Sequence, residues 1–213
     1  MRLLVYSDVH GNLPAMETML QNAGRIDGCI CLGDLVNYGP WSNECVDLAI
    51  SIPNSVFIKG NHEQAFINGR YQGKNLLVNK FFNQCYPGFQ RFEEIKTFAE
   101  NYILNDIIFT HTIQNRNIYI DTEIALDKNY VIGHSHHQFL KKINGCFLWN
   151  TGSVGQNRKY MNIINYLIYN TENQIFEPIA IRYDVDVLIR EMKNRNYPAV
   201  CIEYYEKKEK ILI

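Results

Sequence analysis

Short runs of apolar and β-branched residues recur along the chain, and each run predicts a β-strand. The first three runs, "RLLVYSD" at 2–8, "GCICLGD" at 28–34 and "NSVFIKGNH" at 54–62, are nearly continuously apolar. That pattern is typical of strands buried on both faces. Further strands are expected at 105–112, 129–136, 146–153, 164–170 and 175–183, and a weaker candidate lies at 199–205.

Amphipathic segments with helix signals lie between the early runs. Residues 13–24 follow Asn12 as N-cap, have Pro14 in the first turn and end at Gly24. The other expected helices span 42–52 (from a Ser-Asn cap), 74–86, 88–102 and 184–196 (with Asp184 as cap). Strands that alternate with helices predict parallel β-α-β units, so the expected fold class is α/β. The later strands follow one another closely, as in meanders.

Length and composition are those of a soluble globular protein. The chain has 213 residues, 46% of them hydrophobic and 20% charged, which suits a single domain spanning residues 1–213. The formal net charge of −1 predicts no bulk binding to nucleic acid. The C-terminal segment 204–213 is charged and is expected to be an edge strand or a solvated end. Exposed edge strands near the C-terminus could mediate a homodimer.

The six cysteines lack C-x-x-C spacing, and Cys29 and Cys31 alternate within an apolar run. We therefore expect reduced core thiols and a cytoplasmic protein. The N-terminal apolar run is too short for a signal peptide and is interrupted by Asp8, and no run has transmembrane length. No membrane partner is expected.

All six histidines of the chain follow the carboxyl ends of predicted strands, together with carboxylates and an amide. The strand-end groups are Asp8 with His10, then Asp34, then Asn61 with His62, then His111, and finally His134 with His136 and His137. Ligands of open α/β sheets bind beyond the carboxyl ends of the strands, so these side chains are expected to share one crevice. Oxygen and nitrogen donors without thiolates argue against a structural zinc site. They suit manganese first, with iron, cobalt, nickel or zinc as alternatives, and their number fits two metal ions that share one carboxylate.

The ordered motifs "SDVHGN", "LGDLVNYGP", "KGNHEQA", "FTHT" and "IGHSHH" resemble the signature of the calcineurin-like metallophosphoesterases. "NTGSVGQNRK" and the late "RYDVDVLIREMKNRNYP" resemble the small prokaryotic phosphodiesterase branch of that superfamily. The resemblance extends from Met1 to about Arg158. It implies an α/β/β/α sandwich, in which two mixed sheets are flanked by helices.

The resemblance also implies roles for particular residues. One metal would be held by Asp8, His10, Asp34 and His136, and the other by Asp34, Asn61, His111 and His134. Asp34 would bridge the two ions, and a hydroxide between them would attack phosphorus. His62 would be the catalytic residue that faces the leaving group, where it would donate a proton to the departing oxygen or stabilise charge there. Asn12 and Arg158 would contact the substrate phosphate.

Each of these residues also has a simpler interpretation when taken singly. A strand-end aspartate is an ordinary turn former, and a single histidine such as His111 is more often hydrogen-bonded than metal-bound. His62 could be a cap, Asn12 a helix N-cap, and Arg158 an exposed solvated arginine. His137 matches no ligand of the family and is expected to be a solvated loop residue. Only the combination of five groups in order favours metal binding.

A phosphodiester is the favoured substrate because the stretches after Asp34 and His62 contain no arginine to clamp a dianionic phosphate. Tyr38, Trp41 and Tyr71 could stack on a nucleobase, which makes a nucleotide-type small molecule the expected substrate; ordinary loop packing is the alternative for each ring. A phosphomonoesterase, acting on small molecules or on proteins, is the second hypothesis. A non-catalytic scaffold of the same fold is the third, and it is disfavoured because His62 and every ligand position are present.

Overall fold

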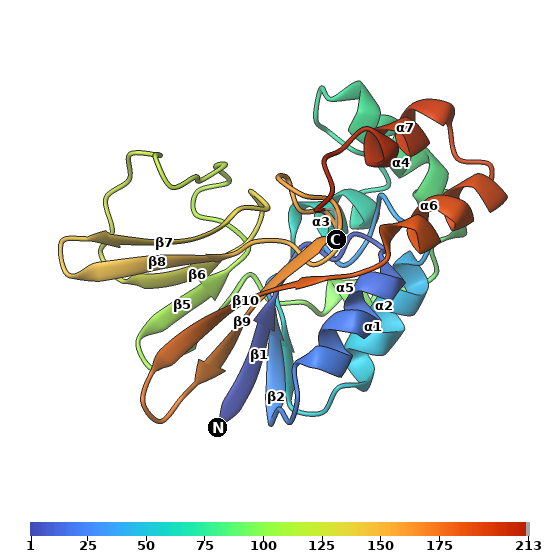
Figure 1. Ribbon diagram of the computed structural model, residues 1–213. Coiled ribbons are helices and arrows are strands. Elements are labelled where there is room, and N and C mark those ends of the chain that lie inside the picture. The colour runs from blue at the N-terminus through green and yellow to red at the C-terminus, as the bar shows by residue number, and fades with distance from the viewer. Residues whose placement is uncertain (212–213) are drawn as a thin grey trace.

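Two five-stranded sheets pack face to face in the computed structural model, which describes residues 1–211 (Figure 1). Strand β1 (Arg2–Tyr6) lies in the middle of the first sheet, whose order is β10-β9-β1-β2-β3. It runs parallel to β2 (Gly28–Cys31), which in turn runs parallel to β3 (Ser55–Phe57). On its other side lie the antiparallel strands β9 (Ile163–Asn170) and β10 (Ile175–Arg182). The expected parallel β-α-β start of the chain is therefore confirmed.

The second sheet has the order β4-β5-β6-β8-β7. Its central strands β5 (Ile107–Thr110), β6 (Asn129–Ile132) and β8 (Cys146–Thr151) are parallel. The edge strands β4 (Asn101–Leu104) and β7 (Gln138–Ile143) are antiparallel to their neighbours. Both sheets are thus mixed, as the fold class requires.

The alternation of side chains along β1 explains how the layers are held together. Leu3 and Val5 belong to the apolar cluster between the two sheets, which also includes Phe109 of the second sheet. Leu4 and Tyr6 point the other way, into the larger cluster beneath the helices. Successive side chains of a strand alternate between its faces, so a continuously apolar strand is needed where both faces are covered.

Helices cover the outer face of the first sheet. Figure 1 shows α1 (Leu13–Asn22), α2 (Ser42–Ser51) and α6 (Val185–Asn194) side by side on this face. The outer face of the second sheet is covered by the irregular segment 112–128, which buries Ile118 and Leu126 against it. The remaining helices are α3 (Asn61–Ile67), α4 (Leu76–Cys85), the short 3-10 helix η1 (Tyr86–Gly88), α5 (Phe92–Lys96) and α7 (Ala199–Glu206).

Two expected elements are wrong. Residues 199–205 form helix α7 and not a strand; Cys201 and Tyr205 are the buried pair, and their spacing of four is helical. The helix expected over 88–102 is reduced to α5, since Asn101–Leu104 forms strand β4 and pairs with β5. The tail is not an edge strand either, because helix α7 ends at Glu206 and the backbone of Ile211 binds Asn162. Residues 212–213 of that expected tail lie outside the described part.

The helix N-caps can be compared with those expected from the sequence. The side chain of Asn12 accepts a hydrogen bond from Ala15 N, and Asp184 accepts one from Asp186 N, so both expected N-caps are confirmed. The Ser-Asn cap is wrong: helix α2 already begins at Ser42, whose hydroxyl accepts from Asn37 N instead. Within residues 1–211, no helix combines the length and the apolar character that crossing a bilayer requires.

Candidate metal centre

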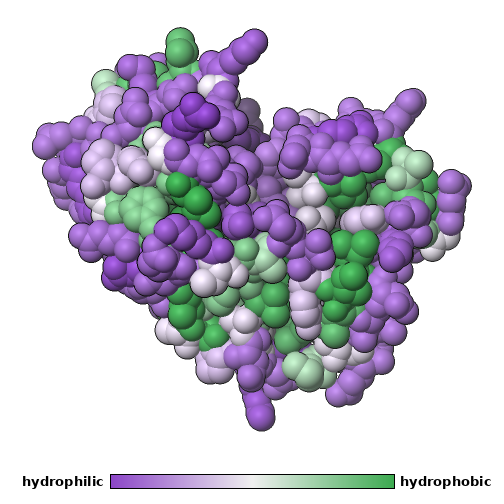
Figure 2. Space-filling view, turned by 180° about the vertical axis from the view of Figure 1, so that it is seen from behind, coloured by the Kyte–Doolittle hydropathy of each residue, from purple (hydrophilic) through white to green (hydrophobic). Residues whose placement is uncertain are grey.

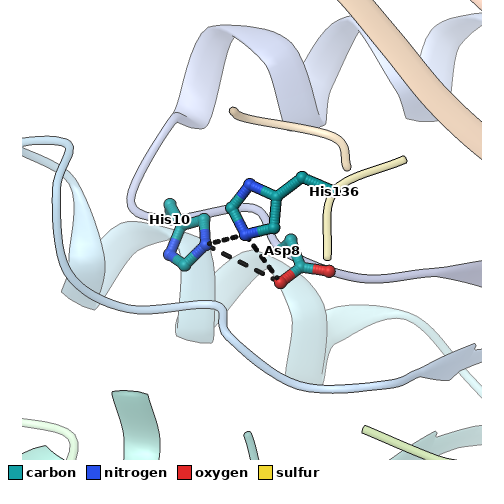
Figure 3. A group of neighbouring side chains, drawn as sticks. All are labelled: Asp8, His10 and His136. Carbon is teal, nitrogen blue, oxygen red and sulfur yellow. Dashed lines mark hydrogen bonds and ion pairs between the residues drawn. The ribbon is translucent and has the colours of Figure 1, made fainter. Parts of the chain in front are cut away.

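Asp8, His10 and His136 form the first group of metal-ligand type, and they come from both sheets (Figure 3). Asp8 and His10 follow β1, whereas His136 follows β6. The Nε2 atoms of the two histidines are 3.1 Å apart. Asp8 Oδ1 lies 3.2 Å from Nε2 of His136 and 3.7 Å from Nε2 of His10. One ion could therefore contact all three residues.

A second group lies beside the first and is composed of Asp34, Asn61, His111 and His134. Nε2 of His111 is 3.0 Å from Asn61 Oδ1, 3.1 Å from His134 Nδ1 and 3.3 Å from Asp34 Oδ2. Asp34 Oδ2 is also 3.9 Å from His10 Nε2 in the first group. The carboxylate of Asp34 consequently stands between the two groups, where a bridging ligand is expected.

Backbone carbonyl groups hold three of the histidine rings through Nδ1. These contacts join His10 to Val36 O (3.3 Å), His111 to Leu32 O (2.8 Å) and His136 to Gln156 O (2.7 Å). A carbonyl oxygen can only accept, so each Nδ1 carries the hydrogen and each Nε2 of a neutral ring presents a lone pair to the cluster. Metal-binding histidines are commonly oriented in this way.

Each carboxylate of the cluster has one oxygen held by the backbone and one oxygen turned inward. Asp8 Oδ2 accepts hydrogen bonds from His134 N and from the hydroxyl of Ser7, and Asp34 Oδ1 accepts one from His62 N. Asp8 Oδ1 is buried and has no hydrogen-bond partner among the described residues. The inward oxygens are the ones that face the histidine nitrogens, so they are available to a cation.

Two hydrogen-bond acceptors at about hydrogen-bond distance repel each other unless a positive charge lies between them. Burial lowers the pKa of His10, and burial together with His111 lowers the pKa of His134 to about 4. Burial also opposes protonation of His111, but the charges of Asp34 and Asp8 outweigh it and raise its pKa to about 10. The oxygen and nitrogen atoms of the cluster therefore need a positive charge among them. Divalent metal ions fit this set of ligands.

Several residues of this cluster have a left-handed backbone conformation. The φ angle is 56° at Asp8, 53° at His10, 58° at Asp34, 68° at His134 and 59° at His136. Residues other than glycine rarely adopt this region, and each costs of order 1 kcal/mol or more. The tight turns that result place side chains of alternate residues in one crevice at the strand ends.

Glu63 supports the turn that carries Asp34, although it is no ligand itself. Its buried carboxylate accepts hydrogen bonds from Asp34 N, Leu35 N, Val36 N and Gly60 N. Gly60 is equally constrained, because a Cβ atom there would lie 2.1 Å from Asp34 Oδ1. The backbone can approach Asp34 this closely only because residue 60 is a glycine, and Glu63 has a structural role.

His62 lies next to the cluster, with Nε2 4.0 Å from Asp34 Oδ2. Its Nδ1 contacts the side-chain amide of Asn37 at 2.9 Å. Asn37 is a site residue that the sequence analysis missed, and its only signal is its place three residues after Asp34 in the same loop. Because Nδ1 is engaged, Nε2 is the ring atom that is free to act on a substrate.

Arg158 joins the site, whereas Asn12 does not. The guanidinium of Arg158 donates to the hydroxyl of Tyr204 and lines a cavity shared with His62 and His136. Both amide hydrogens of Asn12 are used within the protein, by Gly155 O at 3.0 Å and by the hydroxyl of Tyr183 at 2.8 Å. This geometry favours the N-cap interpretation of Asn12 over a contact with phosphate.

Among the other candidate residues, His137 is exposed and its ring packs on Tyr119. This agrees with the expectation that His137 is a solvated loop residue. Trp41 packs against the helical core, whereas Tyr38 and Tyr71 line the cavity beside His62. Tyr204 was missed because it lies on α7, the segment mistaken for a strand.

Two cavities open on either side of the cluster, and Asn61, Tyr71 and His134 line both. The larger has a volume of about 620 Å³ and extends from Lys59 and Gln64 to Asn115. The smaller, of about 270 Å³, contains His62, Arg158 and Tyr204. In the view from behind, Figure 2 shows the surface hollowed between two polar lobes.

A sandwich of mixed sheets with clustered histidine and aspartate at the strand ends defines a metal-binding hydrolase of the phosphoesterase type. A model of the calcineurin-like phosphoesterase family matches residues 1–190, and the chain belongs to this family. The protein is thus a metal-dependent phosphoester hydrolase. The expected fold class is confirmed as well.

Within and beyond this match, the chain is similar to three individual proteins. It is 28% identical over 229 aligned residues to the uncharacterised protein MJ0912 of Methanocaldococcus jannaschii, covering 91% of this chain and 93% of that one. A metallophosphoesterase from Sphaerobacter thermophilus is 26% identical and superposes with a TM-score of 0.78 over 97% of this chain and 98% of its own. The hypothetical protein PH1004 from Pyrococcus horikoshii OT3 has a TM-score of 0.72 at 14% identity, with 96% and 97% coverage, and shares the fold.

Proposed function

We propose that this protein is a phosphodiesterase that uses two divalent metal ions. The observation that carries the proposal is the convergence of acceptor atoms, with Asp34 between two groups. One ion would be held by Asp8, His10, Asp34 and His136, and the other by Asp34, Asn61, His111 and His134. Such ions lower the pKa of water and withdraw charge from the phosphate, and manganese heads the metals that this donor set suits.

His62 supplies the proton for the leaving group. His62 lines the smaller cavity, and its Nδ1 is fixed by Asn37, which leaves Nε2 for the substrate. Arg158 lies in the same cavity and offers a cation to a non-bridging phosphate oxygen, while Tyr204 holds the guanidinium in place. Together these residues bind the ester and provide a path for the proton to the departing oxygen.

The two cavities favour a diester over a monoester. A phosphorus atom at the cluster lies where the cavities meet, since three residues line both of them. A diester has two organic arms and fills both cavities, whereas a monoester leaves one of them to water. A phosphomonoesterase remains the second hypothesis, and the ratio of the two activities distinguishes them.

The test is turnover of bis-p-nitrophenyl phosphate and of p-nitrophenyl phosphate in the presence of Mn²⁺. We expect the diester to have the higher kcat/KM. His62→Ala should lower kcat on the diester by about 10²-fold or more, the usual contribution of a general acid. Metal content measured on the same samples should stay unchanged in this variant, because His62 is not a proposed ligand.

His137→Ala is the matched control, since it removes the neighbouring exposed histidine and should keep full activity. Asp34→Asn should lose both turnover and bound metal. Absence of diester turnover with Mn²⁺, Fe²⁺, Co²⁺, Ni²⁺ and Zn²⁺ would refute the proposal, and a higher kcat/KM for the monoester would favour the second hypothesis.

A further inference from the structure

We infer that the larger cavity is the binding site for the retained arm of the substrate, and that this arm is a nucleoside unit carrying a further anionic group. The inference rests on the proposed phosphodiesterase function. It assigns each arm of the diester to one cavity and names the residues that recognise the retained arm.

The position of His62 decides which arm goes where. His62 lines the smaller cavity and is absent from the residues that line the larger one within the described chain. The group that protonates the leaving oxygen must stand beside that oxygen, so the leaving arm lies in the smaller cavity. The arm that keeps the phosphate therefore lies in the larger cavity, on the side of Lys59 and Gln64.

The reaction is balanced with water as the only co-reactant. Water loses a proton as its oxygen bonds to phosphorus, the bond from phosphorus to the leaving oxygen breaks, and that oxygen takes a proton from His62. The proton released by the water returns through solvent to His62 and restores it. The products are an alcohol from the smaller cavity and a phosphomonoester from the larger cavity.

Size and polarity identify the retained arm. A cavity of about 620 Å³ falls within the roughly 300–1,000 Å³ usual for small-molecule sites. Amide side chains are the most frequent kind in its wall, contributed by Asn61, Gln64, Asn68, Gln72, Asn101 and Asn115. Amides offer donors and acceptors together, which matches the edges of a nucleobase and the hydroxyls of a sugar. The ring of Tyr71 adds an aromatic wall on which a base can stack.

Charge points to an additional anion on the same arm. Lys59 and Glu100 both line the cavity and neutralise each other through an ion pair of 3.1 Å. Arg70 also lines it, and none of the ion pairs found within residues 1–211 includes Arg70. An unpaired guanidinium at a polar cavity suits a phosphate or a comparable anion.

The experiment uses three diesters that share p-nitrophenol as the leaving group. Their retained arms are methyl, thymidine 5′-yl and 3′-phosphothymidine 5′-yl. We expect kcat/KM to rise by about tenfold or more from methyl to thymidine, because neutral hydrogen bonds and stacking on Tyr71 add together. It should rise by about tenfold again on adding the 3′-phosphate, since a hydrogen bond to a charged group is worth about that factor.

Variants then locate each gain. Arg70→Gln should remove the gain from the 3′-phosphate, whereas Lys74→Gln, in the same loop but outside the cavity wall, should keep it. Asn101→Trp should fill the cavity from an exposed strand position and abolish the gain from thymidine. Ile103→Trp, on the same strand and also exposed, is its control because Ile103 does not line the cavity.

The outcomes separate this inference from the proposed function. If the methyl ester is hydrolysed but the thymidine ester is no better, or if Asn101→Trp leaves the ratio unchanged, the arm assignment is overturned while the phosphodiesterase stands. If Arg70→Gln retains the gain from the 3′-phosphate, the anionic group does not bind there and the inference fails in that part. If none of the three diesters nor bis-p-nitrophenyl phosphate is hydrolysed, the proposed function itself has failed.

Discussion

At the scale of single residues, the sequence predicts which polar side chains gather at the strand ends, but it hardly predicts their backbone conformation. Asp8, His10, Asp34, His111, His134 and His136 could be chosen because their residue types and their place after apolar runs carry chemistry of their own. Asp and His adopt the left-handed region more often than most other residues, but the residue type does not show which of them do so, because the surrounding packing decides it. The role of Asn37 was likewise hidden, since its contact with His62 depends on the course of a loop.

Gly60 gives a residue-scale prediction. Gly60→Ala should lower diester turnover by at least about tenfold and cost roughly 1–3 kcal/mol of stability, as overpacking does. The reason is that the added Cβ would lie 2.1 Å from Asp34 Oδ1 and 2.5 Å from Asp34 N, so the proposed bridging carboxylate must move. Steady-state kinetics and urea denaturation measure the two effects.

Gly88→Ala is the control, because a Cβ at Gly88 meets nothing within 4 Å and its φ is not in the left-handed region. It should change stability by less than about 0.5 kcal/mol and leave turnover intact. Full activity in Gly60→Ala would mean that the position of Asp34 matters less than the geometry indicates.

At the scale of elements, the parallel strands and their helices were predictable, whereas two antiparallel edge strands were missed. Strand β4 turns into β5 through Asn105-Asp106, and β7 turns into β8 through Asn144-Gly145. All four turn residues have positive φ. Asn-Gly is a strong local signal for a tight hairpin, so β7 could have been found, but its strand "QFLKKI" is too polar to stand out by hydrophobicity.

The hairpin between β7 and β8 gives an element-scale prediction. Gly145→Ala should lower the free energy of unfolding by about 1 kcal/mol, because φ is 83° there and L-residues pay for that conformation. A Cβ at this position meets no atom within 4 Å, so strain of the backbone is the only expected cost. Urea denaturation of Gly145→Ala, compared with that of Gly88→Ala, isolates the effect of the φ angle. Equal free energies of unfolding in the two variants would contradict a left-handed turn at Gly145.

At the scale of the whole molecule, the class of fold was predictable but the packing of its two halves came only through the family resemblance. The pairing of β9 with β1 joins residues far apart in the sequence, such as Arg2 and Asn170, and hydrophobic patterns do not encode such distant partners. The proposed metal site depends on that packing, since Asp8, His10 and Asp34 follow strands of the first sheet and His111, His134 and His136 follow strands of the second.

Metal removal therefore tests the whole molecule. Ions that bind only the folded chain stabilise it, by about 2.7 kcal/mol at one hundred times the Kd. Chelation with EDTA should then lower the melting temperature by roughly 5–10 °C for a chain of this size. Scanning calorimetry with Mn²⁺ and with EDTA measures the difference.

Asp34→Asn should shrink this difference, while His137→Ala should preserve it. Identical melting temperatures with Mn²⁺ and with EDTA in the unsubstituted protein would show that ions do not join the two sheets.

The partners that orient the histidine rings have a consequence for how this family can diverge. Val36, Leu32 and Gln156 contribute main-chain oxygens, which every amino acid supplies alike. An exchange at any of these positions keeps the oxygen that orients the imidazole, provided that the new side chain fits the buried space of the old one. The carboxylates of Asp8 and Asp34 also accept from main-chain N–H groups. Their surroundings depend in addition on two side chains that few replacements can imitate, because Ser7 donates to Asp8 and Glu63 accepts from the main chain of Asp34.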